Sequence, residues 1–202
     1  MGRREVFGII IGCSKCGTTS LYEYLTQHPE IASCREKEPR FFVEDERWEK
    51  GMGWYRSLWD EDAGPVLMEA TTLYTWVPIV PNAAKRIAQV DGNFRFIYIM
   101  RDPVERAESH LAYGATRGYP QPDDPTENEV VMSVSKYARQ LEEYRERFGR
   151  DKIYTLTLES LRSNPQEELR SVCSFLGVDD EYEFSVTKKH NTTGGRVFGG
   201  AV

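Results

Sequence analysis

The most informative stretch of this 202-residue chain is Phe7-Gly-Ile-Ile-Ile-Gly-Cys-Ser-Lys-Cys-Gly-Thr-Thr-Ser-Leu-Tyr-Glu-Tyr-Leu25. A short apolar run, Val6–Ile11, has the length and the β-branched content of a buried parallel strand. It breaks into a glycine-flanked loop, and residues 18–27 then carry apolar side chains at helical spacing. The loop is therefore expected at the carboxyl end of a strand, where α/β proteins bind their ligands.

The loop carries the groups of an anion-binding site. Its two glycines let the backbone turn sharply and approach a ligand closely, and Lys15 between them supplies a full positive charge. The start of the following helix presents backbone N–H groups with the positive end of the helix dipole behind them. These donors are expected on Gly17, Thr18, Thr19 and Ser20, and the three hydroxyls add further donors.

The order of residues in this loop differs from the Walker pattern of nucleoside-triphosphate-binding proteins. That pattern places Lys directly after the second Gly and follows it with a Ser or Thr that holds magnesium, whereas here Lys15 precedes Gly17. Residues 12–21 instead resemble the 5′-phosphosulfate loop of the sulfotransferases that use 3′-phosphoadenosine-5′-phosphosulfate (PAPS). The resemblance implies that Lys15 is catalytic and that the cofactor is held, without a metal, by Lys15, Cys16, Gly17, Thr18, Thr19 and Ser20.

A second phosphate-binding segment is predicted after a strand over residues 94–100. Arg101 follows this strand directly, and Ser109 lies about two turns along the next helix, so both can reach one phosphate. The order Arg-Asp-Pro, helix, Ser resembles the 3′-phosphate segment of the PAPS-dependent sulfotransferases, which implies that Arg101 and Ser109 bind the cofactor. A surface arginine followed by an ordinary helix start is the alternative.

A third motif is the charged run over residues 34–42, which ends on two phenylalanines. Together with residues 51–55 it resembles the heparan-type carbohydrate sulfotransferases, and this resemblance implies that Glu38 is the general base on the acceptor hydroxyl. A carboxylate near an apolar wall can have its pKa raised toward a useful value. His110 is the rival base, because a neutral imidazole has a suitable pKa without tuning. A solvated loop that the phenylalanines anchor to the core is the alternative.

Two further segments are candidates for the site. Residues 69–74 match the heparan-type pattern at Glu69, Thr71 and Tyr74, so this loop is expected to line the acceptor site unless it is an ordinary turn. In the family a C-terminal basic loop folds over the nucleotide phosphates. The resemblance therefore implies that Lys188, Lys189 and Arg196 are candidates for binding the phosphates of the cofactor. The alternative is that they belong to a solvated tail.

The chain is predicted to form one domain over residues 1–202. Expected strands near residues 6, 66, 94 and 153 alternate with helices, which predicts an α/β fold of three layers, P-loop-like, around a central parallel sheet. The same pattern predicts helices over residues 78–90, 127–148 and 165–176, and a mobile polar loop over residues 112–127.

Composition and charge restrict the class of protein further. The net charge of −6 argues against nonspecific nucleic-acid binding. The longest apolar run is far shorter than the roughly 20 residues that span a bilayer, and it has no signal-peptide cleavage pattern, so we expect no membrane contact and a cytoplasmic location. Cys13 and Cys16 have the spacing of a redox pair or of half a zinc site, but the sequence has no second Cys or Cys-His pair to complete a tetrahedral zinc site. We expect reduced thiols that fill a tight loop.

The sequence thus predicts an enzyme that moves the sulfuryl group of PAPS to an acceptor hydroxyl by in-line displacement and releases adenosine 3′,5′-bisphosphate (PAP). The acceptor is a small molecule or a carbohydrate, and neither its identity nor the oligomeric state follows from the residues. Two alternatives stay open: a P-loop kinase for a small molecule, and a nucleotide-binding domain without catalysis. A kinase is expected to have the Gly-Lys-Ser/Thr order that this loop lacks.

Overall fold

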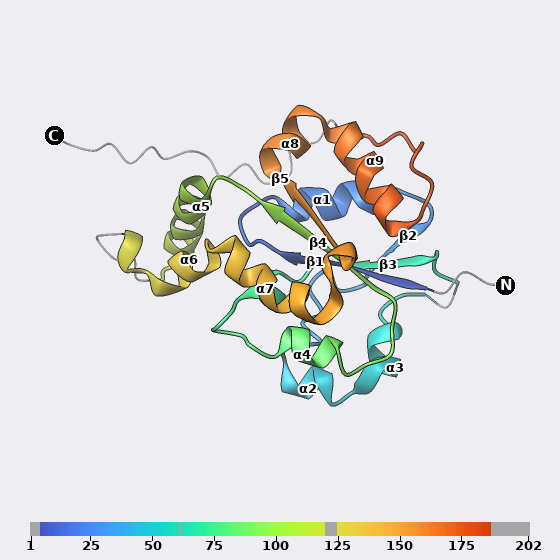
Figure 1. The fold of residues 1–202 in the computed structure, drawn as a ribbon, viewed down its shortest axis with the longest axis horizontal. Helices are drawn as coiled ribbons and strands as arrows, with labels where there is room; N and C mark the ends of the chain where they lie inside the picture. The colour runs from blue at the N-terminus through green and yellow to red at the C-terminus, as the bar shows by residue number, and fades with distance from the viewer. Residues whose placement is uncertain (1–4, 61, 120–124, 187–202) are drawn as a thin grey trace.

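The computed structural model describes residues 5–60, 62–119 and 125–186. A single five-stranded parallel sheet forms its centre, in the order β2-β3-β1-β4-β5 (Figure 1). The strands are β1 Val6–Gly12, β2 Ile31–Ser33, β3 Val66–Glu69, β4 Phe94–Met100 and β5 Ile153–Thr157. The strand order reverses between β1 and β4, and ligands of such sheets bind at the carboxyl ends of the strands at this point.

Helices cover both faces of the sheet. α1, α8 and α9 lie on one face, α2, α3, α4 and α7 lie on the other, and α5 and α6 lie beyond the end toward which the strands point (Figure 1). Their bounds are α1 Thr18–Leu25, α2 Asp45–Trp48, α3 Gly51–Arg56, α4 Ala83–Ile87, α5 Pro103–Thr116, α6 Glu129–Val134, α7 Tyr137–Phe148, α8 Leu158–Ser163 and α9 Pro165–Leu176. Short 3₁₀ segments are η1 Thr72–Thr75, η2 Pro125–Glu127 and η3 Arg150–Lys152. Each helix in the described part of the chain is too short or too polar to span a bilayer. The predicted three-layer α/β fold is confirmed.

The central strands are apolar on both sides because both faces are covered. Phe7 of β1 stacks on Tyr55 of α3, with ring centroids 5.6 Å apart. The next residue, Gly8, faces α9, where a Cβ would lie 3.4 Å from the Leu176 side chain. Successive residues of β1 therefore pack on opposite layers, and the strand forms the middle of the core.

Phe41 and Phe42 fix the segment that carries Glu38. Both rings are fully buried, and Phe41 stacks on Tyr55 at 4.7 Å between centroids. Burial of one such side chain contributes roughly 1.5–3 kcal/mol to stability. The anchoring of the run to the core by the phenylalanines, which belonged to the alternative interpretation of this run, is thus correct.

The prediction of one continuous helix over residues 127–148 is wrong. The chain leaves the helical conformation at Lys136, with φ −85° and ψ 68°, and α6 and α7 are separate helices. The buried Arg106 donates from Nε to Ser135 Oγ and from Nη2 to the Val131 carbonyl. α6 thus ends where its last turn packs on a charged group from α5.

Other boundaries also differ from the sequence pattern. α5 continues to Thr116, so the polar segment predicted from residue 112 as a mobile loop begins as helix. The helix expected over residues 78–90 is confined to Ala83–Ile87, after two prolines that disfavour a helical interior. β2 was not predicted, because it has only three residues.

Glu69 at the end of β3 is a carboxylate inside the core. It is fully buried and accepts hydrogen bonds from Tyr55 Oη at 2.8 Å and Thr71 Oγ1 at 2.6 Å. Burial raises the pKa of Glu69 to about 7, although these hydrogen bonds oppose the shift. Thr71 and Tyr74 are buried as well. The expectation that these three side chains line an acceptor site is therefore wrong, because they support the core beneath it.

The raised pKa of Glu69 predicts a specific pH dependence of stability. The folded protein holds this proton more tightly than the unfolded chain, whose glutamates have a pKa of about 4.3, so the stability contributed by protonated Glu69 is lost as pH rises from about 4 to 7. Each unit of pKa shift corresponds to about 1.4 kcal/mol. Urea unfolding should therefore show that the wild type loses stability relative to Glu69→Gln across this interval.

Glu49→Gln is the matched control, because Glu49 is exposed, and it should leave the pH dependence of the wild type unchanged. Parallel stability curves for the wild type and Glu69→Gln would contradict this account of Glu69.

Candidate active site

The loop between β1 and α1 leaves the start of α1 open to a ligand. Gly17 is the N-cap residue, with φ 88°, and because glycine has no side chain, no side-chain capping hydrogen bond comes from this position. A Cβ at this position would lie 2.7 Å from Leu158 Cδ1, so both the backbone conformation and the packing require glycine. The N–H groups of the first turn have no carbonyl partner within a helix, and the dipole favours an anion there. The geometry agrees with the predicted phosphate cradle.

Lys15 lies among other cations beside this loop. Its Nζ is 4.2 Å from the centroid of the Tyr113 ring on α5. Burial lowers the pKa of Lys15, and the positive charges of Arg101 and Arg117 lower it further. Arg117 also lies over Tyr113, with Cζ 4.9 Å from the centroid. Three like charges thus meet at the end of β1 and β4, and a bound anion would relieve their mutual repulsion.

Arg101 follows β4, as predicted, and is held from two sides. Tyr137 Oη on α7 donates to the Arg101 carbonyl at 2.8 Å. The guanidinium donates to Glu105 Oε2 from Nη2 at 2.5 Å and from Nε at 3.0 Å. Ser109 is half-buried on α5, and among the described residues no hydrogen bond links it to Arg101. The charge of Arg101 thus acts on Lys15, but among the residues that the structure describes no direct contact joins the two predicted phosphate ligands Arg101 and Ser109.

His110 is held by the buried Arg106. Arg106 Nη1 donates to His110 Nδ1 at 3.0 Å. Because a guanidinium can only donate, Nδ1 accepts and the ring proton lies on Nε2. Burial, Arg106 and Lys15 together lower the pKa of His110 to about 4. The remaining nitrogen is thus a donor at neutral pH, which weakens the case for His110 as the base.

Glu38 lies near the loop, because its neighbour Lys37 contacts both the loop and Glu38. Lys37 Nζ donates to Thr19 Oγ1 at 2.9 Å, in the first turn of α1, and lies 3.8 Å from Glu38 Oε1. About a third of the Glu38 side chain is exposed, at 34%. The predicted base therefore lies beside the predicted phosphate loop and is open to an acceptor.

The cysteines of the loop are buried in the protein. Cys13 and Cys16 are free thiols and are buried, which agrees with the predicted reduced state. The Cys16 N–H donates to the Cys13 carbonyl at 3.2 Å, and its Sγ lies 3.9 Å from Tyr137 Oη. Neither its side chain nor its N–H is directed to a ligand, so the prediction that Cys16 binds the cofactor is not supported by its geometry.

Among the other loop residues, Thr19 and Ser20 are half-buried and Thr18 is buried, and their predicted role in binding the cofactor stays a prediction. The candidates Lys188, Lys189 and Arg196 lie outside the described residues. Sequence reasoning missed Tyr113, Arg117 and Tyr137, because their roles depend on helix packing. Lys37 could have been found from its position next to Glu38.

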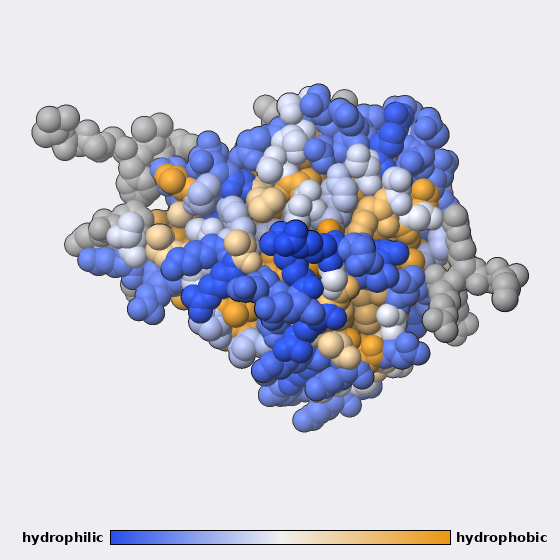
Figure 2. Space-filling view, viewed as in Figure 1, coloured by the Kyte–Doolittle hydropathy of each residue, from blue (hydrophilic) through white to orange (hydrophobic). Residues whose placement is uncertain are grey.

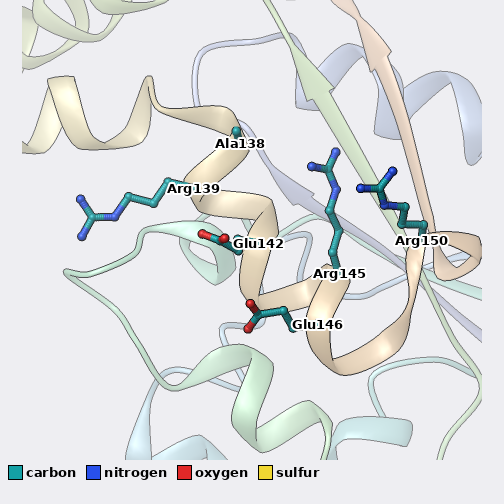
Figure 3. A pocket seen from close by; sticks show the side chains of 6 residues that line it. All are labelled: Ala138, Arg139, Glu142, Arg145, Glu146 and Arg150. Atoms are coloured by element: carbon teal, nitrogen blue, oxygen red, sulfur yellow. The ribbon is translucent and has the colours of Figure 1, made fainter.

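A hollow on the outer face of α7 is a second candidate surface. Figure 2 shows hydrophilic side chains gathered over α7. The residues that line the hollow are Ala138, Arg139, Glu142, Arg145, Glu146 and Arg150, all exposed. Arg145 and Arg150 point to one side and Arg139 to another, with the glutamates between them (Figure 3). The arginines do not converge on one point, so this hollow offers no arrangement of donors comparable to that of the loop site.

Comparison with known proteins agrees with the loop site. Residues 8–193 match the family model described as "Sulfotransferase domain". The chain belongs to the sulfotransferase family. It is 31% identical over 201 residues to mouse heparan sulfate glucosamine 3-O-sulfotransferase 3B1, a match that covers 89% of this chain and 49% of that protein. The predicted family and the likeness to its heparan-type members are thus confirmed. This sulfotransferase chain spans about half the length of the curated relatives it matches.

Solved sulfotransferases share the fold. A sulfotransferase from Alicyclobacillus acidocaldarius superimposes with a TM-score of 0.75 at 24% identity, covering 95% of this chain and 87% of that one. The mouse sulfotransferase SULT7A1, solved in complex with PAP, gives a TM-score of 0.55 at 16% identity, covering 89% of this chain and 61% of that one. At these identities the likeness establishes the fold alone.

The expectation of a cytoplasmic protein is contradicted by the relatives. They are sulfotransferases of heparan sulfate and are not cytoplasmic enzymes. The expectation rested on the lack of a long apolar run and of a leader. Such an absence carries no weight in a chain that spans only part of its relatives.

The arrangement around His110 predicts its titration. Because Arg106 occupies Nδ1 and the pKa of His110 lies near 4, NMR should show a neutral ring, protonated on Nε2, throughout pH 5.5–8. Lys15→Met removes one of the charges that lower this pKa, so it should raise the pKa of His110. A His110 that titrates near 6.5 in the wild type would contradict this geometry.

Proposed function

We propose that this sulfotransferase-family chain moves the sulfuryl group of PAPS to a hydroxyl of a carbohydrate or small-molecule acceptor. The observation that carries the proposal is the group of Lys15, Arg101 and Arg117 beside the uncapped start of α1. A glucosamine-containing saccharide is the first acceptor to test, because the curated relatives are named for such substrates. The PAP complex of a neighbour with the same fold supports the cofactor.

The residues present fit the anionic parts of PAPS. Backbone N–H groups, an ammonium and guanidinium groups are the donors that bind phosphate and sulfate, and none of them needs a metal. Lys15 and the first turn of α1 would hold the 5′-phosphosulfate, and Arg101 with Ser109 would hold the 3′-phosphate. When bound, PAPS supplies a sulfuryl group attached to a phosphate leaving group.

Lys15 and Glu38 would carry the chemistry. Lys15 stabilises the negative charge that grows on the leaving oxygen, more in the transition state than in the ground state. Glu38 accepts the proton of the attacking hydroxyl, because it lies beside the loop and one side of it is open. His110 is a poorer base, since its free nitrogen carries the ring proton.

The alternatives have less support. No observation favours a kinase, whose loop needs Lys directly after the second glycine. A binder without catalysis would not need a carboxylate beside the donor loop. The proposal is tested by titration calorimetry with PAP and with ATP, where binding of PAP alone is expected and binding of ATP alone would reverse the assignment.

The two phosphate segments should respond differently to mutation. Lys15→Ala should lower turnover on the order of a hundredfold, because it removes a group that acts on the transition state. Arg101→Ala should mainly raise the Michaelis constant for PAPS, because the 3′-phosphate is remote from the reacting sulfur and contributes uniform binding. Steady-state kinetics with PAPS and a saccharide acceptor separate the two effects. Near-normal turnover in Lys15→Ala would remove Lys15 from the mechanism.

The identity of the base is tested by Glu38→Gln against His110→Ala. The amide keeps the shape of Glu38 but cannot take a proton, so turnover should fall by roughly a hundredfold or more while PAP affinity by calorimetry is retained. His110→Ala should keep most of the activity. Loss of activity in the histidine variant alone would transfer the role to His110.

A further inference from the structure

Lys37 lies where the two halves of the proposed site meet. Its Nζ touches Thr19 Oγ1 at 2.9 Å on the donor side and lies 3.8 Å from Glu38 Oε1 on the acceptor side. Thr19 belongs to the first turn of α1, and Glu38 is the proposed base. A cation that contacts both groups would lie between a bound donor and an attacking hydroxyl.

The position of Lys37 is fixed by backbone and side-chain contacts. The Ala70 N–H, directly after β3, donates to the Lys37 carbonyl at 2.9 Å. Burial lowers the pKa of Lys37, although the carboxylates of Glu38 and Glu23 raise it. A lysine that served only solubility would extend into water, whereas this ammonium lies against a hydroxyl at a helix start, where the dipole disfavours a cation.

We propose that Lys37 is a second catalytic cation, oriented by Thr19, that binds the sulfuryl group in transfer. This inference rests on the proposed function. An ammonium has three donors: one goes to Thr19, Glu38 Oε1 lies 3.8 Å away as an ion-pair partner, and a donor is left for a sulfuryl oxygen. Lys15 approaches the start of α1 from its own loop and lies over Tyr113 of α5, whereas Lys37 comes from the segment after β2. The two lysines would thus hold the reacting group from different elements.

The proposal predicts that Lys37 distinguishes PAPS from PAP, because only PAPS carries the sulfuryl group. Calorimetry in the cold, without acceptor, should show that Lys37→Met weakens PAPS binding about tenfold and leaves PAP binding within about twofold, since a charge-assisted hydrogen bond to the sulfuryl group is lost. Turnover should fall on the order of a hundredfold, as for other groups that stabilise developing charge. Lys37→Arg should restore part of the PAPS affinity.

Three variants complete the test. Lys85→Met is the matched control, because Lys85 is exposed on α4, and it should change neither affinity. Thr19→Val removes the hydroxyl that orients Lys37 and should lower PAPS affinity, whereas Thr19→Ser should retain it. In a Thr19→Val background, Lys37→Met should have a smaller effect than in the wild type, because the two residues act together.

The outcomes separate this inference from the function on which it rests. Equal weakening of PAP and PAPS in Lys37→Met would overturn the inference and make Lys37 a phosphate ligand. A lowered melting temperature with both affinities unchanged would overturn it in favour of a structural role. A wild type that binds PAP but shows no dependence on Lys37 leaves the proposed function standing without the inference, and a wild type that binds neither nucleotide overturns both.

Discussion

The parallel pairing of β1 with β4 is the constraint on which the candidate site depends. The pairing continues past the end of β1, where the Cys13 N–H donates to the Ile99 carbonyl at 2.8 Å. Parallel strands end at the same edge of a sheet, so the loop after β1 and the arginine after β4 are forced together. Lys15 and Arg101 are close enough for their charges to interact for this reason. Without this pairing the two phosphate segments would be unrelated stretches of sequence.

The cations of the candidate site repel one another. Lys15, Arg101 and Arg117 share one region, and the fully buried Arg106 adds a fourth charge behind His110. In the free protein these cations are offset in part by Glu105, which pairs with Arg101. These cations repel one another in the ligand-free protein. A ligand with several negative charges would relieve this repulsion, and the relief would favour its binding. The whole chain has a net charge of −6, so the excess of cations is confined to the site.

Local patterns were sufficient for four of the five strands, β1, β3, β4 and β5, and for several of the helices. The bounds of β3, β4 and α9 follow from apolar runs, and for α9 from Pro165 at its start and Gly177 after its end. Long-range contacts account for what was missed. At the break between α6 and α7, Arg106 of α5 donates to Ser135. The contact of Lys37 with Thr19 joins residues 18 positions apart. The burial of Glu69 and Thr71 could not be read from a motif, since buried and exposed turns share the same residue types.

We infer that the ends of β1 and β4 form one site for a nucleotide with two phosphate groups. A crystal structure of this chain with PAP would show this site. The 5′-phosphate is expected at the start of α1 within hydrogen-bonding distance of Lys15, and the 3′-phosphate is expected on Arg101. A nucleotide bound elsewhere, for example in the hollow over α7, or one whose 3′-phosphate is remote from Arg101, would contradict it.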